Sequence, residues 1–326
     1  VLLSYQAPKW MDKENLKLTF NGFYDNTHDV TTFASSRLEG SVQADQTLSK
    51  ATTLLYRFSY RLVKVDASTL VIDPNLIPLL SRPERIGIPS FTFVRDTRDN
   101  PIESHKGRFI TVDTGISSRV FGSEASFARV LVQHSAYHSF YKGKYVLAYG
   151  TKIGFEPPFG AVGAVVPLPE RFFAGGGNTL RGFSINQAGP RDHQTGYPVG
   201  GESMFVNNIE WRMPAVVLPF FGNSVSPVLF HDMGNVFAAS TDLFRSLGRV
   251  TQKNGAQCQL VSATANCSFN YLSHAIGGGL RYKTPIGPVR LDVGYNLNPP
   301  TFPIRSESRA VTLRHVNFFF SIGQTF

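Results

Sequence analysis

Apolar and polar residues alternate along several stretches of the chain, and this period of two is typical of a β-strand with two unlike faces. From Val289 to Asn298 every odd position is apolar and every even position is polar or glycine. Residues 54–62, 145–156 and 276–283 largely follow the same alternation. No run reaches the roughly 18 apolar residues of a membrane-spanning helix, so we expect no transmembrane helix.

Thirteen segments are predicted to be strands, many of them about 9–12 residues long, which is enough to cross a bilayer at a tilt. Strands of soluble sandwiches usually run about 5–6 residues. In a barrel one face contacts lipid, and the polar or small face lines a lumen. An aromatic sandwich core is the competing explanation for the tyrosines on the apolar faces. The predicted strands cover residues 2–9, 15–26, 30–44, 51–65, 88–97, 107–120, 124–139, 143–156, 202–213, 225–237, 273–284, 287–298 and 312–326.

The connections between these segments differ in length. The turn at 284–287 is tight, whereas the connections 238–272 and 299–311 are long. The longest, 157–201, is rich in glycine and proline, and structureless connections of this length are usually functional or disordered. Short turns at one end and long loops at the other form the topology of an outer-membrane barrel. We therefore predict an all-β fold, with one antiparallel transmembrane β-barrel domain over residues 1–326.

The composition agrees with a barrel. Hydrophobic residues make up 42% of the 326 residues and charged residues 17%, and the mean hydropathy is −0.08. Soluble domains usually carry about 25% charged residues. The net charge of +9 comes from lysines and arginines scattered among the strands. Because no basic run is present, nucleic acid is not expected as a partner, and the charge is assigned to the lumen and loops.

Residues suited to catalysis or metal binding are sparse. His134 and His138 stand four apart, which is a metal-ligand spacing on a helix but not on a strand. His231 and Asp232 are neighbours, so in a strand they point to opposite faces and cannot form a dyad. We therefore predict no metal, no cofactor and no catalytic residue, and an enzyme is not expected.

The two cysteines, Cys258 and Cys267, lie in one polar connection. They belong to no Cys/His zinc pattern. In an exported protein they either form a disulfide within the loop or remain two free thiols.

Four blocks follow one another in the second half of the chain. They are residues 172–183 (FFAGGGNTLRGF), 207–214 (NNIEWRMP), 230–237 (FHDMGNVF) and 318–326 (FFFSIGQTF). In this order they resemble the BamA/TamA superfamily of outer-membrane assembly and translocation barrels, and its BamA branch most of all. The Asp-rich turn that follows Arg95 resembles the same family.

The resemblance implies a barrel of sixteen strands, of which this chain has about thirteen. The opening of the chain, as far as Trp10, resembles the fourth strand of the family. Three further strands and the periplasmic POTRA domains are therefore expected upstream of Val1. The odd strand count agrees with that expectation, since an open sheet leaves two unpaired edges in lipid.

The resemblance also implies that the long connection folds back into the lumen with Arg181, Gly182 and Phe183 at its tip. Glu210 lies on the inward face of its predicted strand, and the resemblance places Asp232 inward as well. A guanidinium is a planar fork of donors that fits carboxylates, so we predict that Arg181 pairs with Glu210, Asp232 or both. An ordinary ion pair that only adds rigidity is the alternative.

Gly175, Gly176 and Gly177 precede this tip, and glycine permits positive φ and close backbone approach. We therefore predict a compact re-entrant loop at 157–201, with a flexible surface loop as the alternative. The resemblance further implies that the last strand is a β-signal read by assembly machinery. The alternative is a lipid-facing closing strand without a signal function. The residues of this predicted signal are Phe318, Phe320, Ile322, Gly323 and Phe326.

The function implied by the resemblance is insertion and folding of β-barrel proteins in the outer membrane through a lateral gate. Outer-membrane lipids, unfolded client proteins, periplasmic chaperones and accessory lipoproteins are the expected partners. The alternatives are a TamA-like or two-partner-secretion translocation barrel and, from another class, a passive porin or a lipolytic barrel enzyme. The expected location is the outer membrane of a Gram-negative-type cell.

Overall fold

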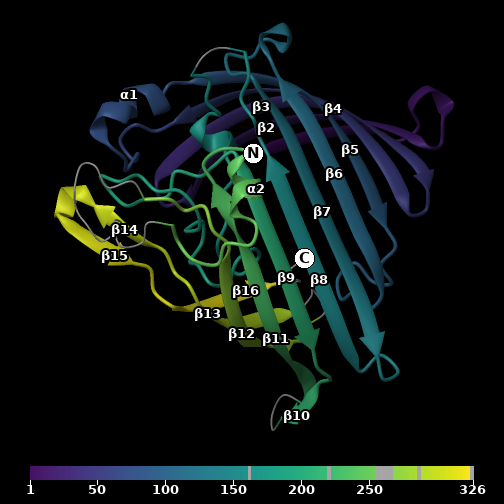
Figure 1. Cartoon of the computed structure of the whole chain (residues 1–326). Coiled ribbons are helices and arrows are strands. Elements are labelled where there is room, and N and C mark those ends of the chain that lie inside the picture. Colours follow the sequence, from purple (N-terminus) through teal and green to yellow (C-terminus); the bar gives the residue numbers. More distant parts are fainter. Residues whose placement is uncertain (161–162, 219–221, 254–257, 259–266, 285–287, 324–326) are drawn as a thin grey trace.

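The computed structural model describes residues 1–326 except 161–162, 219–221, 254–257, 259–266, 285–287 and 324–326. One antiparallel sheet of fourteen strands curves into a barrel wall (Figure 1); thirteen of them form a continuous row, and the short strand β10 (Val216–Leu218) lies off this row and pairs with β11. The strands of the row are β1 (Leu2–Ala7), β2 (Leu16–Val30), β3 (Phe33–Ser49), β4 (Thr52–Val65), β5 (Glu84–Asp96), β6 (Gly107–Ser117), β7 (Phe127–Phe140), β8 (Tyr145–Phe155), β9 (Ser203–Arg212), β11 (Gly222–Phe237), β12 (Ser273–Tyr282), β13 (Val289–Asn296) and β16 (Val316–Ile322).

All thirteen predicted strands are present, although their ends differ. The last strand begins at Val316 rather than at 312, because residues 309–312 pair elsewhere. The prediction missed short elements within the connections: the strand β10 (Val216–Leu218), the hairpin of β14 (Thr301–Ile304) and β15 (Arg309–Thr312), the helices α1 (Ile77–Leu80) and α2 (Asp242–Ser246), and the 3-10 turns η1 (Trp10–Asp12), η2 (Pro74–Leu76), η3 (Arg119–Phe121), η4 (Leu168–Glu170) and η5 (Arg305–Glu307).

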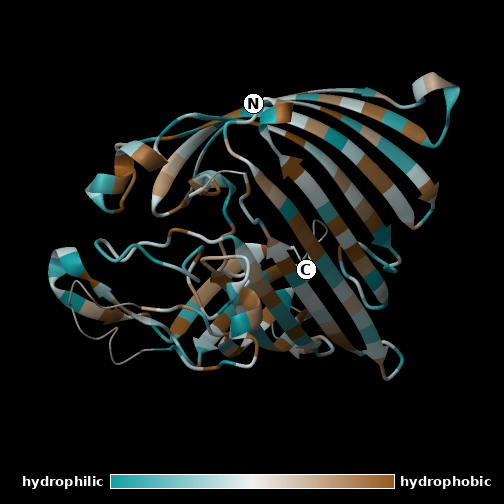
Figure 2. Cartoon of the chain, turned by 45° about the horizontal axis from the view of Figure 1, so that its top comes forward, coloured by the Kyte–Doolittle hydropathy of each residue, from teal (hydrophilic) through white to brown (hydrophobic). Residues whose placement is uncertain are grey.

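The apolar faces of the strands are exposed and the polar faces are buried, which is the reverse of a soluble sheet. On β13, Leu291 is 53% exposed and Val293 43%, whereas Arg290 is 0% and Asp292 2% exposed. Figure 2 shows the resulting alternation of hydrophobic and hydrophilic positions along the strands. This arrangement is that of a transmembrane barrel, in which lipid covers the outer face and polar side chains fill the lumen. A soluble sandwich with an aromatic core is thereby excluded.

Connections at the two ends of the sheet differ in size. One end carries short turns, such as residues 50–51 between β3 and β4 and 141–144 between β7 and β8. The opposite end carries the long connections 157–201, 238–272 and 297–315. The tight turn predicted at 284–287 lies mostly outside the described residues. In the described ranges, no pairing joins β1 to β16, and no helix is long and apolar enough to cross a membrane.

The turn between β5 and β6 is organised by one carboxylate and yields a testable expectation. Asp99 Oδ1 accepts hydrogen bonds from the backbone amides of Asn100, His105 and Lys106, at 2.9–3.0 Å. Slight burial acts to raise the pKa of Asp99, but these three amides outweigh it and hold the pKa below its usual value. The ionised form therefore stabilises the turn at neutral pH, and this contribution disappears as the pH falls through the lowered pKa.

We expect Asp99→Asn to accelerate hydrogen exchange at the amides of His105 and Lys106 at neutral pH, because a neutral acceptor binds amides less strongly than a carboxylate. Peptide-resolved exchange in detergent micelles measures this. Asp12→Asn, in another short turn, is the control. Unchanged exchange in Asp99→Asn would show that the carboxylate does not organise the turn.

Candidate functional site: the loop tip in the lumen

The connection 157–201 turns back against the inner face of the sheet. Isolated bridges pair Phe172 with Gly201, Ala174 with Ala188 and Arg191 with Pro198, so the loop has an internal antiparallel framework. Its apolar side chains form a hydrophobic cluster with residues of β9 and β11, comprising Phe172, Ala174, Leu180, Phe183, Ala188, Met204, Val206 and Val236. The loop therefore fills this part of the lumen as a packed core, and the alternative of a flexible surface loop does not fit.

Arg181, at the tip, is completely buried and makes ionic contacts with two strands. Its Nε and Nη2 donate to the two carboxylate oxygens of Asp232 on β11, at 2.8 and 2.7 Å. Its Nη1 donates to Oε1 of Glu210 on β9 at 2.6 Å. The backbone amide of Arg181 also donates to Asp232, at 2.9 Å. The structure thus brings all three predicted residues together, with the bidentate geometry that only arginine provides.

A second group of charged residues surrounds this pairing and was not assigned from the sequence. Asp292 on β13 lies 3.7 Å from Nη1 of Arg181 and accepts from Arg281 at 2.5 Å and from Arg290 at 3.2 Å. Arg281 also donates to Glu210, at 3.2 Å. Four arginines, including Arg212, thus share three buried carboxylates, so each carboxylate is compensated. The sequence indicated part of this group, because the alternation of apolar and polar residues places these charged side chains on the inward faces of their strands.

Arg290 holds the loop at a second point. Its Nη2 donates to the carbonyl oxygen of Gly177 at 2.7 Å, and its Nη1 donates to Oδ1 of Asn178 at 3.1 Å. The guanidinium is 0% exposed. Nothing in the alternation of β13 indicates this contact, since it depends on the path of a loop more than a hundred residues earlier in the chain.

An aromatic ring and an amide complete the surroundings of Arg181. The guanidinium carbon stands 3.5 Å from the ring centre of Phe230, a close cation–π contact in a dry site. Asn208 donates to Asp232 at 2.8 Å and to the carbonyl oxygen of Thr179 at 2.6 Å. Both side chains lie in the blocks singled out in the sequence, yet their contacts require the folded loop.

The rest of the tip is held through its backbone. The carbonyl oxygen of Gly182 accepts from Asn296 on β13 and from Asn317 on β16, both at 3.0 Å. A side chain at Gly182 would meet the Cβ of Ala275 at 2.8 Å, so glycine is required for the close approach. Phe183 points into the hydrophobic cluster and is 2% exposed. The tip therefore connects four strands, β9, β11, β13 and β16.

The glycines before the tip form a tight turn. Gly175 and Gly176 have φ of 117° and 101°, and a Cβ on Gly175 would stand 2.3 Å from the carbonyl oxygen of Ser184. The amide of Gly176 donates to the carbonyl oxygens of Leu180 and Phe183, at 3.2 and 2.9 Å. Gly177 lacks a positive φ and instead approaches Phe319 of β16. The predicted compact turn fits this geometry.

The predicted β-signal lies on the exposed face of β16. Phe318, Phe320 and Ile322 are 76%, 68% and 57% exposed, which suits contact with lipid. Gly323 follows the strand with a positive φ of 100°. Phe326 lies outside the described residues. Lipid contact and recognition as a signal are both compatible with this exposure.

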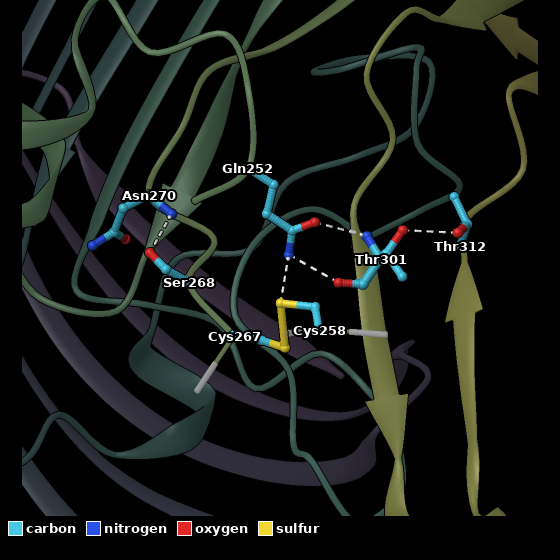
Figure 3. Close-up of a disulfide and its surroundings, with 7 residues drawn as sticks. All are labelled: Gln252, Cys258, Cys267, Ser268, Asn270, Thr301 and Thr312. Carbon is cyan, nitrogen blue, oxygen red and sulfur yellow. Dashed lines mark hydrogen bonds between the residues drawn. A yellow bond between two sulfur atoms is a disulfide. The ribbon is translucent and has the colours of Figure 1, made fainter. Parts of the chain in front are cut away.

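A disulfide joins Cys258 to Cys267 within the connection 238–272 at the long-loop end (Figure 3). Gln252 donates to the sulfur of Cys258 at 3.5 Å and to the carbonyl oxygen of Thr301, on β14, at 2.8 Å. The two cysteines pack with Phe302 and neighbouring apolar residues in a buried cluster. The guanidinium of Arg191 lies over Phe302 at 4.5 Å, so the long connection joins the same assembly.

We expect Cys258→Ser with Cys267→Ser to loosen this assembly locally by about 2–3 kcal/mol, the entropy of closing so short a loop. Hydrogen exchange at the amide of Thr301 measures the effect, which should leave the thermal midpoint of the barrel nearly unchanged. Ser268→Ala, next to the disulfide, is the control. An unchanged exchange rate would mean that packing alone holds the loops.

The histidines belong to no cluster of potential metal ligands in the described part of the chain. No group of three potential metal ligands occurs there. His231 contacts His274, with Nε2 and Nδ1 3.1 Å apart, while Asp232 points into the lumen. The predicted opposition of His231 and Asp232 is thus observed.

The fold and the lumen site define an outer-membrane β-barrel whose lumen holds an anchored loop. A model of the Omp85 superfamily domain matches residues 1–326, and the chain belongs to this family of integral outer-membrane proteins. The chain is 26% identical over 261 residues to the outer membrane protein assembly factor BamA of Nitratidesulfovibrio vulgaris. The aligned region covers 78% of this chain and 28% of that protein.

Solved structures show the same fold. BamA from Haemophilus ducreyi lacking POTRA domains 1–3 superposes with a TM-score of 0.72 at 16% identity, covering 98% of this chain and 62% of that one. CdiB from Acinetobacter baumannii superposes with a TM-score of 0.51 at 12% identity, covering 99% of this chain and 50% of that one. The chain thus spans less than two thirds of these relatives' length.

Proposed function

We propose that the chain is the barrel of an outer-membrane protein assembly factor of the BamA type, which inserts and folds β-barrel proteins. Membership of the Omp85 superfamily over residues 1–326 and the relation to a BamA sequence support this proposal. The single observation that carries it is the lumen filled by loop 157–201 and pinned by Arg181, since a passive porin needs an open lumen.

In this mechanism the edge of the sheet at β16 is one side of a lateral gate. An unfolded client strand adds to a free edge by backbone hydrogen bonds, as in β-augmentation. The pinned tip contacts β16 through Asn317 and Ser184, so the loop fixes the position of the gate strand from inside. Client proteins, lipids, periplasmic chaperones and accessory lipoproteins are the proposed partners, and the chain has no enzymatic role.

A folding assay tests this function. The purified chain is reconstituted in lipid vesicles, a urea-unfolded outer-membrane barrel is added, and the folded fraction is followed by its heat-dependent gel mobility. We expect faster client folding than in protein-free vesicles. Equal rates would contradict the insertase mechanism.

A translocation barrel is the second candidate, since the CdiB fold also matches, although its TM-score is lower than that of BamA. A passive porin or lipolytic barrel is the candidate from another class. Single-channel recording separates porin from plugged barrel: we expect small, flickering conductance, and a steady wide pore would favour the porin.

A further inference from the structure

A groove on the outer face of the barrel combines exposed aromatic rings with two lysines. It lies where β7, β8 and β9 reach the short turn at residues 141–144, and its volume is about 910 Å³. We call it the headgroup groove and define it by Phe140, Tyr141, Lys142, Lys144, Tyr145 and Trp211. Short turns lie on the periplasmic side of such barrels, so the groove is at that membrane interface.

The rings of the groove form a connected row. Tyr141 meets Tyr145 edge-on, with ring centres 5.8 Å apart, and Tyr145 lies 6.4 Å from Trp211. Trp211 pairs across the sheet with Leu147, and both are exposed on the lipid side. Tryptophan and tyrosine prefer this depth, because their rings suit the boundary between acyl chains and headgroups. The floor of the groove therefore accommodates an acyl chain.

The two lysines carry charges that no ion pair among the described residues neutralises, since Glu103, which lines a neighbouring pocket with Lys144, pairs with Lys283. Lys142 and Lys144 are exposed, and within the described ranges neither takes part in an ion pair. Two other lysines at this end of the barrel are compensated: Lys9 pairs with Glu14 at 3.2 Å, and Lys283 with Glu103 at 2.9 Å. Lys50, in the turn between β3 and β4, has no ion pair in the described ranges. The local charge of the groove is thus positive, which complements an anionic headgroup.

The backbone of the turn is also unusual. Tyr141, Lys142 and Gly143 follow one another with φ of 47°, 57° and 87°. A left-handed conformation is easy for glycine but unfavourable for tyrosine and lysine, and such strain is often retained at functional sites. Here it occurs at Tyr141, which is 80% exposed and lines the groove together with the two lysines.

We propose that the headgroup groove binds an anionic phospholipid of the periplasm-facing leaflet. Lys142 and Lys144 contact the headgroup phosphate, and the acyl chain lies along Tyr145 and Trp211. This inference rests on the chain being an outer-membrane barrel and is independent of insertase activity.

Fluorescence of Trp211 tests the proposal directly. The sequence has two tryptophans, so Trp10→Phe leaves Trp211 as the single reporter. The variant is reconstituted in vesicles of phosphatidylcholine and phosphatidylglycerol, with bromine on the chains of one lipid or the other as a short-range quencher. The ratio of quenching gives the relative affinity for the anionic lipid. We expect a clear preference for phosphatidylglycerol, about fivefold per lysine and roughly 25-fold for the pair.

Lys142→Ala with Lys144→Ala should reduce this preference to near one, whereas arginine at both positions should retain it. Lys50→Ala, in another short turn, is the matched control. If the double alanine variant does not fold, 0.5 M salt on the single-tryptophan protein provides a second measurement, and we expect about the same loss because surface charges are screened. No preference, or one that survives both changes, would overturn the proposal.

Discussion

Arg181→Ala is expected to destabilise the barrel by about 3–5 kcal/mol, the cost of leaving buried carboxylates without their partner. Asp232 loses two side-chain donors in this variant and keeps Asn208 as its side-chain partner. The cation–π contact with Phe230 is lost as well. Unfolding in urea, followed by heat-dependent gel mobility in detergent, measures the change. Arg249→Ala, an exposed loop arginine, is the control.

The arrangement of charges predicts how the loss can be repaired. Removal of the charge at residue 232 in the variant Arg181→Ala/Asp232→Asn should recover part of the stability, because Glu210 and Asp292 still face Arg281. Asp232→Asn alone should cost less than Arg181→Ala, since Arg181 keeps Glu210. Arg181→Lys should recover little, because an ammonium cannot make the bidentate contact. If Arg181→Ala resembles the control, the tip does not pin the loop.

If the loop tip has a role beyond rigidity, the variants at Arg181 should change both the stability of the barrel and the rate of client folding. The same variants in the vesicle assay distinguish two cases. Loss of client folding in Arg181→Lys, with the barrel still folded, supports a role of the pinned loop in insertion. Unchanged folding rates would leave Arg181 as a structural ion pair only.

The strands could be predicted from the sequence because each side of the barrel wall requires one type of residue. Lipid selects apolar residues at 291, 293 and 295, and the lumen selects Arg290 and Asp292. The two-residue alternation of apolar and polar positions therefore predicted both where the strands lie and which face of each strand points to lipid. The hairpin of β14 and β15 was missed because strands of four residues are too short to show alternation.

The pairing of Arg181 came from the resemblance of motifs, not from the alternation. Inward orientation alone leaves many possible carboxylate partners in a ring of strands. The contacts of Arg290 with Gly177 and of Phe230 with Arg181 depend on the path of the loop, which local sequence does not determine. Tertiary contacts of loops are thus the part that only the structure supplies.

Gly294 gives the second large expected effect, because the loop tip rests directly on it. A Cβ at this position on β13 would stand 2.1 Å from the carbonyl oxygen of Arg181, and backbone cannot move aside as a side chain can. We expect Gly294→Ala to cost at least about 2–3 kcal/mol, the upper range for overpacking a core. Gly40→Ala, on β3 with nothing within 4 Å, should be nearly neutral.

A double-mutant cycle shows whether the cost of Gly294→Ala arises from the tip. In the Arg181→Ala background the tip has lost its ionic anchors and can move away from β13, so the added methyl group should cost less than in the wild type. The two changes should therefore couple, with the double variant more stable than the sum of the single effects predicts. Strict additivity would mean that the methyl group disturbs β13 itself, whose partner at this register is Gly277 of β12, and not the seat of the loop tip.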